Sequence, residues 1–319
     1  MNDLLKILSK SLKPFGYHIA RHSAPALLKI KNIEAGQDGE QSILFPRHYF
    51  DGCVFDPPSA LDLNHLKIYL RSCMRDHRNV NKKMRVSGDS ENDTLLACIA
   101  SLVAAVNYLD QQNPALSIDV ICLDDRSDAG NLARIDHILS GLNCPWHIKQ
   151  TAISGQGKSL HEQFSLARQE KGLCYFIEDD YLHEVQGIDR LYQFYLKIIN
   201  DFNAHCVLYT QESDNIYHEA YPSYLLKGQD CRWRTVRHAT HSFFIHSHYV
   251  DHFWKYFENT KYVGVKSKRR AGSERNTTNK LFLHMPGFVP LTPAAVHLQF
   301  QETLPPFYDW QVLYKLYQQ

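Results

Sequence analysis

This sequence lacks a strong net charge, cysteine pairs and a long apolar run, and each absence argues against a class of protein. The formal net charge of the 319 residues is +1, whereas a general nucleic-acid binder needs a basic field. The eight cysteines include no CxxC pair, which argues against a disulfide framework or a zinc site and favours a reducing compartment. We also identify no bilayer-spanning stretch and no signal peptide.

The composition that is present is that of a globular protein with a full core. Hydrophobic residues make up 44% of the chain and charged residues 22%, which is ordinary for soluble domains. Residues 4–13 alternate leucine and isoleucine with lysine and end before Pro14, a pattern typical of a short basic amphipathic helix. Such a helix either lies on an anionic membrane surface or packs on its own domain. The first alternative predicts peripheral contact with the inner face of the cell membrane.

From residue 83 onward, apolar runs alternate with helical patterns. This alternation is typical of βαβ units around a parallel sheet. The expected strands lie at residues 84–87, 117–123, 146–150 and 173–177, and the expected helices at 94–107, 131–140 and 160–170. We therefore treat residues 1–82 as an N-terminal extension and 83–319 as one α/β domain. Residues 83–182 would form its nucleotide-binding half and 183–319 its acceptor-binding half.

Two of the expected strands end in acidic residues. The run at 173–177 is followed by Glu178, Asp179 and Asp180, and the run at 117–123 by Asp124 and Asp125. Two carboxylates 4 Å apart repel by about 4 kcal/mol at an effective dielectric of 20, and a hard divalent cation offsets such repulsion. Ligands of α/β proteins bind at the carboxyl ends of the strands. The pattern predicts either a metal and ligand crevice or a solvated acidic edge.

The order of these motifs resembles the nucleotide-sugar glycosyltransferases of the GT-A fold, and is closest in layout to family 2. That family carries Asp-Asp-Gly-Ser-x-Asp after its second strand, and residues 124–128 read Asp-Asp-Arg-Ser-Asp. A polar glycine turn, a helix with Ala-Arg-Asn and a strand ending in Asp-x-Asp follow in the family. The corresponding residues are 155–157, Ala-Arg-Gln at 167–169, and Glu-Asp-Asp at 178–180. The resemblance spans residues 83–300 and implies a GT-A-like, Rossmann-type, mainly parallel sheet flanked by helices.

The resemblance also implies roles for individual residues. Asp180 would bind Mn²⁺ or Mg²⁺, with His297 as a further ligand, and Glu274 would be the general base of an inverting transfer. The donor, a nucleoside-diphosphate sugar, would contact Ser87, Asp125, Lys158, Glu178 and Asp179. The acceptor would be a glycan or a lipid-linked sugar. The basic segment, which we define as residues 266–270, reads as an exposed mobile loop that could close over the diphosphate.

Several alternatives remain open from the residues alone. Residues 152–159 nearly match a P-loop, which would make the protein a nucleotide-binding NTPase or kinase with Lys158 on the phosphates. The departures at Arg126 and Glu178 also fit a catalytically degenerate protein that only binds glycan. Asp230 and Glu212 are rivals of Glu274 as the base. The histidines between residues 238 and 248 favour an aromatic and polar acceptor surface over a zinc site.

Overall fold

A computed structural model describes residues 61–75, 86–212 and 224–318 of the chain. The predicted amphipathic helix at residues 4–13 lies outside these ranges, and so do the first two residues of the strand expected at 84–87. Val86 and Ser87 lie in a turn, so the described half of that expected strand is not extended.

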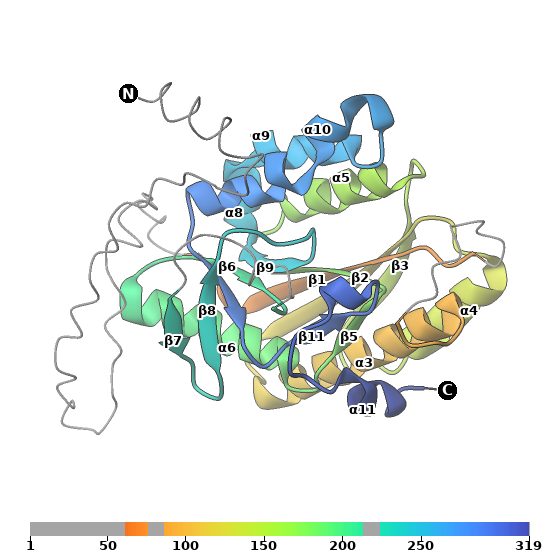
Figure 1. The fold of residues 1–319 in the computed structure, drawn as a ribbon, viewed down its shortest axis with the longest axis horizontal. Helices are drawn as coiled ribbons and strands as arrows, with labels where there is room; N and C mark the ends of the chain where they lie inside the picture. The colour runs from red at the N-terminus through yellow and green to blue at the C-terminus, as the bar shows by residue number, and fades with distance from the viewer. Residues whose placement is uncertain (1–60, 76–85, 213–223, 319) are drawn as a thin grey trace, which may run out of the picture.

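Nine strands of the described residues form one mixed sheet in the order β3-β2-β1-β4-β9-β6-β10-β8-β7 (Figure 1). The strands β3, β2, β1 and β4 pair in parallel, while β9 runs antiparallel to both β4 and β6. The bounds are β1 His65–Ser72, β2 Ser117–Asp124, β3 Trp146–Gln150, β4 Leu173–Glu178, β6 Val207–Tyr209, β7 Leu225–Lys227, β8 Arg232–Val236, β9 Phe243–His246 and β10 Gly287–Pro290. The predicted α/β architecture is confirmed, with β3, β2, β1 and β4 as the parallel part of the sheet.

The strand β1 corrects the expected domain boundary. It lies in the region that we treated as an N-terminal extension, yet it pairs with β2 on one side and β4 on the other. The charged residues Lys67 and Arg71 mask its strand pattern. Lys67 contacts Asp119 of β2 at 3.5 Å, so a cross-strand partner offsets a charge that argued against a central strand. The domain therefore begins before residue 83.

Helices cover both faces of the sheet (Figure 1). The helices α3, α4 and α6 lie on one face, and α5, α8, α9 and α10 on the other. Their bounds are α3 Glu91–Gln112, α4 Ala129–Leu139, α5 Gln156–Ala167, α6 Gly187–Phe202, α8 Ser247–His252, α9 Trp254–Phe257, α10 Arg269–Gly272 and, near the C-terminus, α11 Trp310–Lys315. The short 3₁₀ helices are η2 Glu258–Tyr262, η3 Lys266–Lys268, η4 Glu274–Asn276, η5 Thr278–Leu283 and η6 Gln301–Thr303. The helices expected at 94–107, 131–140 and 160–170 are thus confirmed, with shifted ends.

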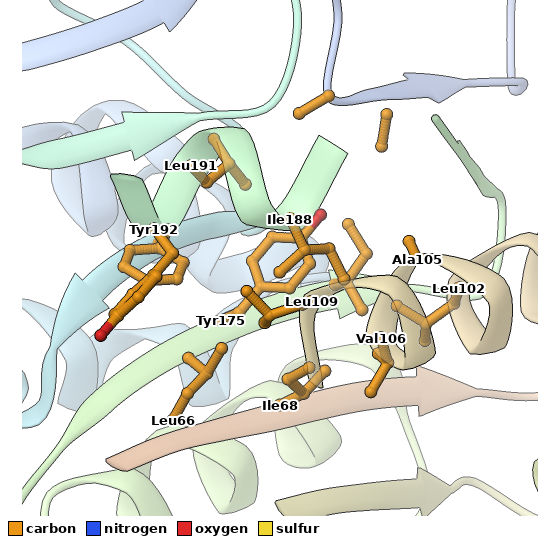
Figure 2. Close-up of a cluster of buried hydrophobic side chains, with 14 of the residues drawn as sticks. Leu66, Ile68, Leu102, Ala105, Val106, Leu109, Tyr175, Ile188, Leu191 and Tyr192 are labelled. Atoms are coloured by element: carbon orange, nitrogen blue, oxygen red, sulfur yellow. The ribbon is translucent and has the colours of Figure 1, made fainter. Parts of the chain in front are cut away.

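The larger core lies between the sheet and the pair α3 and α6. Figure 2 shows Leu102 and Val106 of α3 and Ile188 of α6 packed over Ile68 of β1 and Tyr175 of β4. By length and hydropathy α3 could cross a membrane, contrary to our expectation that no stretch could. Most of its apolar window is buried inside the protein, so we assign it to this core.

A second, two-stranded sheet pairs β5, Tyr181–His183, with β11, Ala295–His297. The pairing is antiparallel, with His297 opposite Tyr181. Because β5 follows β4 after a two-residue turn, this small sheet brings a late segment of the chain to the carboxyl edge of the main sheet.

Candidate active site

The candidate site lies where β1, β2 and β4 end together. The register pairs Ser72 of β1 with Asp124 of β2, and Arg71 of β1 with Glu178 of β4. We expected the two acidic strand ends to be direct neighbours, but β1 lies between them. Since adjacent strands are about 4.8 Å apart, the acidic groups of β2 and β4 face each other across the end of one strand.

The three acids after β4 have different surroundings. The carboxylate of Asp179 accepts a hydrogen bond from the Cys73 backbone N–H at 2.9 Å, and the Asp179 N–H donates to the Arg71 carbonyl at 3.1 Å. Asp179 therefore ties β4 to the end of β1, which is a structural task that the sequence did not suggest. Asp180 is 6% exposed, and its backbone carbonyl accepts from Leu298 at 2.9 Å.

Glu178, Asp180 and His297 converge to form the candidate metal site. One possible ligand atom from each lies within 4.8 Å of the others, and Nε2 of His297 is 3.3 Å from Oδ2 of Asp180. The small sheet causes this convergence, because it places His297 opposite Tyr181, the residue after Asp180. The rings of Tyr181 and His297 stack with centroids 4.4 Å apart. The structure thus brings together the two predicted metal residues.

The chemistry of this donor set fits a divalent cation. His297 is buried, and neither of its ring nitrogens has a hydrogen-bond partner among the described residues. Its backbone is fixed because the His297 N–H donates to the side-chain oxygen of Gln211 at 2.9 Å. Carboxylate oxygens suit Mg²⁺ and Mn²⁺, and an imidazole suits transition metals better than Mg²⁺. Asp180 and His297 would hold such an ion.

Sequence reasoning missed Arg71 as a site residue. Its side chain is buried, forms an ion pair with Glu178 and donates from Nη1 to the hydroxyl of Ser159 at 3.1 Å. Burial lowers the pKa of Arg71, while the nearby Asp179 and Asp180 act to raise it. The apolar residues Leu66, Ile68 and Leu70, which alternate before Arg71, were the available signal.

Asp125 lies on the β2 side of the site and is 6% exposed. Its Oδ2 accepts a hydrogen bond from the Gly155 N–H at 2.8 Å, and its Oδ1 has no hydrogen-bond partner among the described residues. Oδ1 lies 3.8 Å from Nη2 of Arg75 and keeps the capacity to accept a hydrogen bond from a ligand. The next residue, Arg126, has a φ of +62°, a left-handed conformation that favours glycine. At the position of the motif's glycine, Arg126 thus adopts a backbone conformation that glycine favours.

Asp124 belongs to the turn rather than to the site surface. Its side chain is fully buried and accepts from the Ser72 hydroxyl at 3.0 Å and from the Ser127 N–H at 3.0 Å. This is the turn-capping role that aspartate favours.

The geometry argues against the P-loop alternative. The hydroxyl of Ser159, which would bind a metal ion in a P-loop, instead accepts from Arg71 and donates to the Gln156 carbonyl at 3.0 Å. At Gly157, a Cβ atom would lie 2.6 Å from the Val263 carbonyl oxygen. This part of the loop therefore faces a protein carbonyl, and an electronegative oxygen disfavours a phosphate. Lys158 is exposed in the first turn of α5.

Glu274, the predicted base, lies in η4 and faces the histidines of the site. Its Oε1 is 3.9 Å from Nδ1 of His241. Burial raises the pKa of Glu274, and the nearby His297 acts in the opposite direction. Its side chain is nevertheless 46% exposed, so a substrate can reach the carboxylate.

The rival bases are committed to other partners. Asp230 forms an ion pair with Arg190 at 2.8 Å, and Glu212 forms one with Arg234 at 3.1 Å. These contacts favour Glu274.

Ser87 and the basic segment are the remaining predicted donor contacts. The hydroxyl of Ser87 lies 2.7 Å from that of Thr94, in the turn that precedes α3, so it supports the helix start. The basic segment forms the helical turns η3 and α10 rather than a loop, and all of residues 266–270 are exposed. Lys268, Arg270 and Asn276 line a shallow hollow there.

The predicted acceptor surface of histidines is not a single surface. His241 contacts the site through Glu274, whereas His246 pairs with Leu173 at the opposite end of β4 and contacts the Asp62 carbonyl at 3.0 Å. In the described ranges, the one group of three or more His, Cys, Asp or Glu side chains with metal-ligand spacing is that of Glu178, Asp180 and His297.

Comparison with known proteins finds only distant likenesses. No family model and no curated protein matches the chain. Among solved structures, residues 1–349 of S. aureus TarS share 12% identity and a TM-score of 0.40, over 71% of this chain and 57% of TarS. The galactosyltransferase LgtC, solved with donor and acceptor sugar analogs, shares 11% identity and a TM-score of 0.37, over 68% of this chain and 70% of LgtC. The UTP-bound UGPase of Acinetobacter baumannii shares 6% identity and a TM-score of 0.38, over 80% of this chain and 92% of the UGPase. The function is therefore argued from the site itself.

Proposed function

We propose that this protein is a metal-dependent glycosyltransferase that moves a sugar from a nucleoside-diphosphate sugar to a glycan or lipid-linked acceptor with inversion. One observation carries the proposal. A buried Asp180 and His297 pair, 3.3 Å apart at the carboxyl edge of a parallel sheet, lies near the accessible carboxylate of Glu274. Ligand sites of open α/β sheets lie at this edge.

Each residue has a separate task in the proposed reaction. Oδ1 of Asp125 accepts a hydrogen bond from the donor base. Asp180 and His297 hold a divalent cation, which when bound supplies Lewis-acid stabilisation of charge on the diphosphate. Glu274 takes the proton of the acceptor hydroxyl. The acceptor oxygen then bonds to the anomeric carbon as the bond from that carbon to the diphosphate breaks, and the nucleoside diphosphate leaves with the bonding electrons.

Calorimetric titration with a panel of nucleotides and nucleotide sugars, with and without Mn²⁺, tests this proposal. We expect one nucleoside diphosphate to bind only when Mn²⁺ is present. Binding without turnover against any acceptor would support the degenerate, glycan-binding alternative. ATP binding that depends on Lys158 would support the P-loop alternative, and no nucleotide binding would refute the transferase.

The basic segment supports donor binding in this proposal. Arg269 and Arg270 are exposed, and no ion pair joins either to an acid of the described ranges. Because guanidinium groups bind phosphate well, replacing both by alanine should weaken nucleoside-diphosphate binding about tenfold. Titration at two salt concentrations should show a smaller salt dependence than in the wild type. Arg134→Ala, on α4 across the sheet, is the control and should bind like the wild type.

The proposed setting is the cytoplasm, at the inner face of the cell membrane, where lipid-linked acceptors and nucleotide sugars meet. The basic amphipathic pattern of residues 4–13 supports it. This localisation stays a prediction.

A further inference from the structure

A buried arginine lies among the carboxylates of the proposed metal site. Arg71 is the penultimate residue of β1, the strand between the acidic ends of β2 and β4, and it is 9% exposed. Asp179, Asp180 and Asp125 all stabilise its positive charge. The guanidinium of Arg71 therefore already offsets part of the negative charge of these acids.

The contacts of Arg71 select one acid of the site. Its Nη2 donates to Glu178 in a close ion pair, and its Nη1 donates to Ser159. Its Nε has no hydrogen-bond partner in the parts of the chain that the structure describes. The strand register fixes the pair, because Arg71 and Glu178 are aligned on neighbouring parallel strands. Glu178 is thus neutralised by the protein itself.

Asp180 and His297 are the remaining two residues of the convergent group. They lie 3.3 Å apart, and His297 has no other hydrogen-bond partner for its ring within the described ranges. A divalent cation that took Glu178 as a ligand would have to approach the guanidinium that holds it. Like charges repel strongly at short range and low dielectric, so such an approach is unfavourable.

We propose that the ion pair with Arg71 keeps Glu178 from acting as a metal ligand. A divalent cation would then have two protein ligands, Asp180 and His297, and the nearby positive charge of Arg71 would oppose its binding. This inference rests on the proposed function, because it concerns the same metal site. Its consequence is a protein that binds free Mn²⁺ weakly and binds it well only together with a negatively charged diphosphate. Arg71 is then a positioning residue that makes the metal depend on the donor.

A double-mutant cycle with Mn²⁺ alone tests this inference, with free Mn²⁺ followed by electron paramagnetic resonance. Arg71→Met should tighten Mn²⁺ binding by about tenfold or more, because a repelling charge is removed and a carboxylate is released. Glu178→Gln should change the affinity less than about threefold. The double variant should keep only the part of the gain that comes from removing the positive charge, and should bind Mn²⁺ more weakly than Arg71→Met. Arg168→Met, an exposed arginine paired with Asp251 at 2.7 Å, is the control and should bind like the wild type.

The outcomes are distinguishable from those of the nucleotide experiment. A tenfold loss of Mn²⁺ affinity in Glu178→Gln would show that Glu178 is a ligand in the wild type and would overturn the inference. Unchanged affinity in Arg71→Met, or no Mn²⁺ binding by any variant, would overturn it as well. If circular dichroism shows that Arg71→Met is unfolded, Arg71→Gln, which keeps a donor for Ser159, replaces it with the same expected gain. Mn²⁺ binding without nucleotide binding would refute the transferase, and the Mn²⁺ affinities of the variants would still test the role of Arg71.

Discussion

Replacing Asp180 by asparagine is expected to reduce kcat/KM for sugar transfer by about a thousandfold or more, which corresponds to about 4 kcal/mol of transition-state stabilisation. Asparagine keeps the size of the side chain but removes the charge that faces His297 at 3.3 Å. We expect Mn²⁺-dependent nucleoside-diphosphate binding to fall with activity. Steady-state kinetics over a range of Mn²⁺ concentrations, with calorimetry, measure both.

The fold should survive this change. The contact of Asp180 with Leu298 uses its backbone carbonyl, which asparagine retains. Asp251→Asn, an exposed acid on α8, is the control and should keep full activity. Wild-type activity of Asp180→Asn at low Mn²⁺ would refute a metal role for this carboxylate.

Glutamine at position 274 should reduce kcat by roughly a hundredfold to ten-thousandfold while leaving donor binding intact. The amide cannot take the acceptor proton, although it preserves the shape of the side chain. The residues that we propose for the donor base and the metal, Asp125, Asp180 and His297, are unchanged in this variant. Kinetics of the variant, with calorimetry of the donor, separate the two effects. Glu258→Gln on η2, an exposed acid paired with Lys261, should behave like the wild type.

The pH profile gives the same prediction a sign. Burial raises the pKa of Glu274, and the group acts as a base only when it is ionised. The rate should therefore increase as the pH rises through this elevated pKa and decrease below it. We expect the acid limb of the profile to lie above the pH range of an ordinary glutamate and to disappear in Glu274→Gln. An acid limb that persists in the variant would transfer the role of base to another group.

The strands that could be predicted from the sequence are those whose apolar runs are bounded by turn residues or charged residues. β2, β3 and β4 were located to within one residue at each end, because turn residues and charges flank them. β1 was missed because its charged residues look like surface positions. Lys67 and Arg71 find their partners on strands that lie far away in the chain, and single-sequence patterns carry no such pairing.

The same physical reason divides the site. Asp180 and His297 could be predicted from their place in the resembled family. Their contact could not, because it depends on the pairing of β5 with β11. The commitment of Asp179 to Cys73 and of Glu178 to Arg71 could not be predicted. Adjacent residues with the same charge acquire different roles through partners that only the folded chain supplies.

The small sheet of β5 and β11 also has a consequence for biosynthesis. Chains are made from the N-terminus, and β1, β2, β3 and β4 precede β11 by much of the sequence. The part of the sheet formed by β1 to β4 can thus begin to fold on the ribosome before His297 has been added. A nascent chain at that stage holds its acidic turn without the imidazole, so the proposed metal site stays incomplete until the segment with β11 has been made.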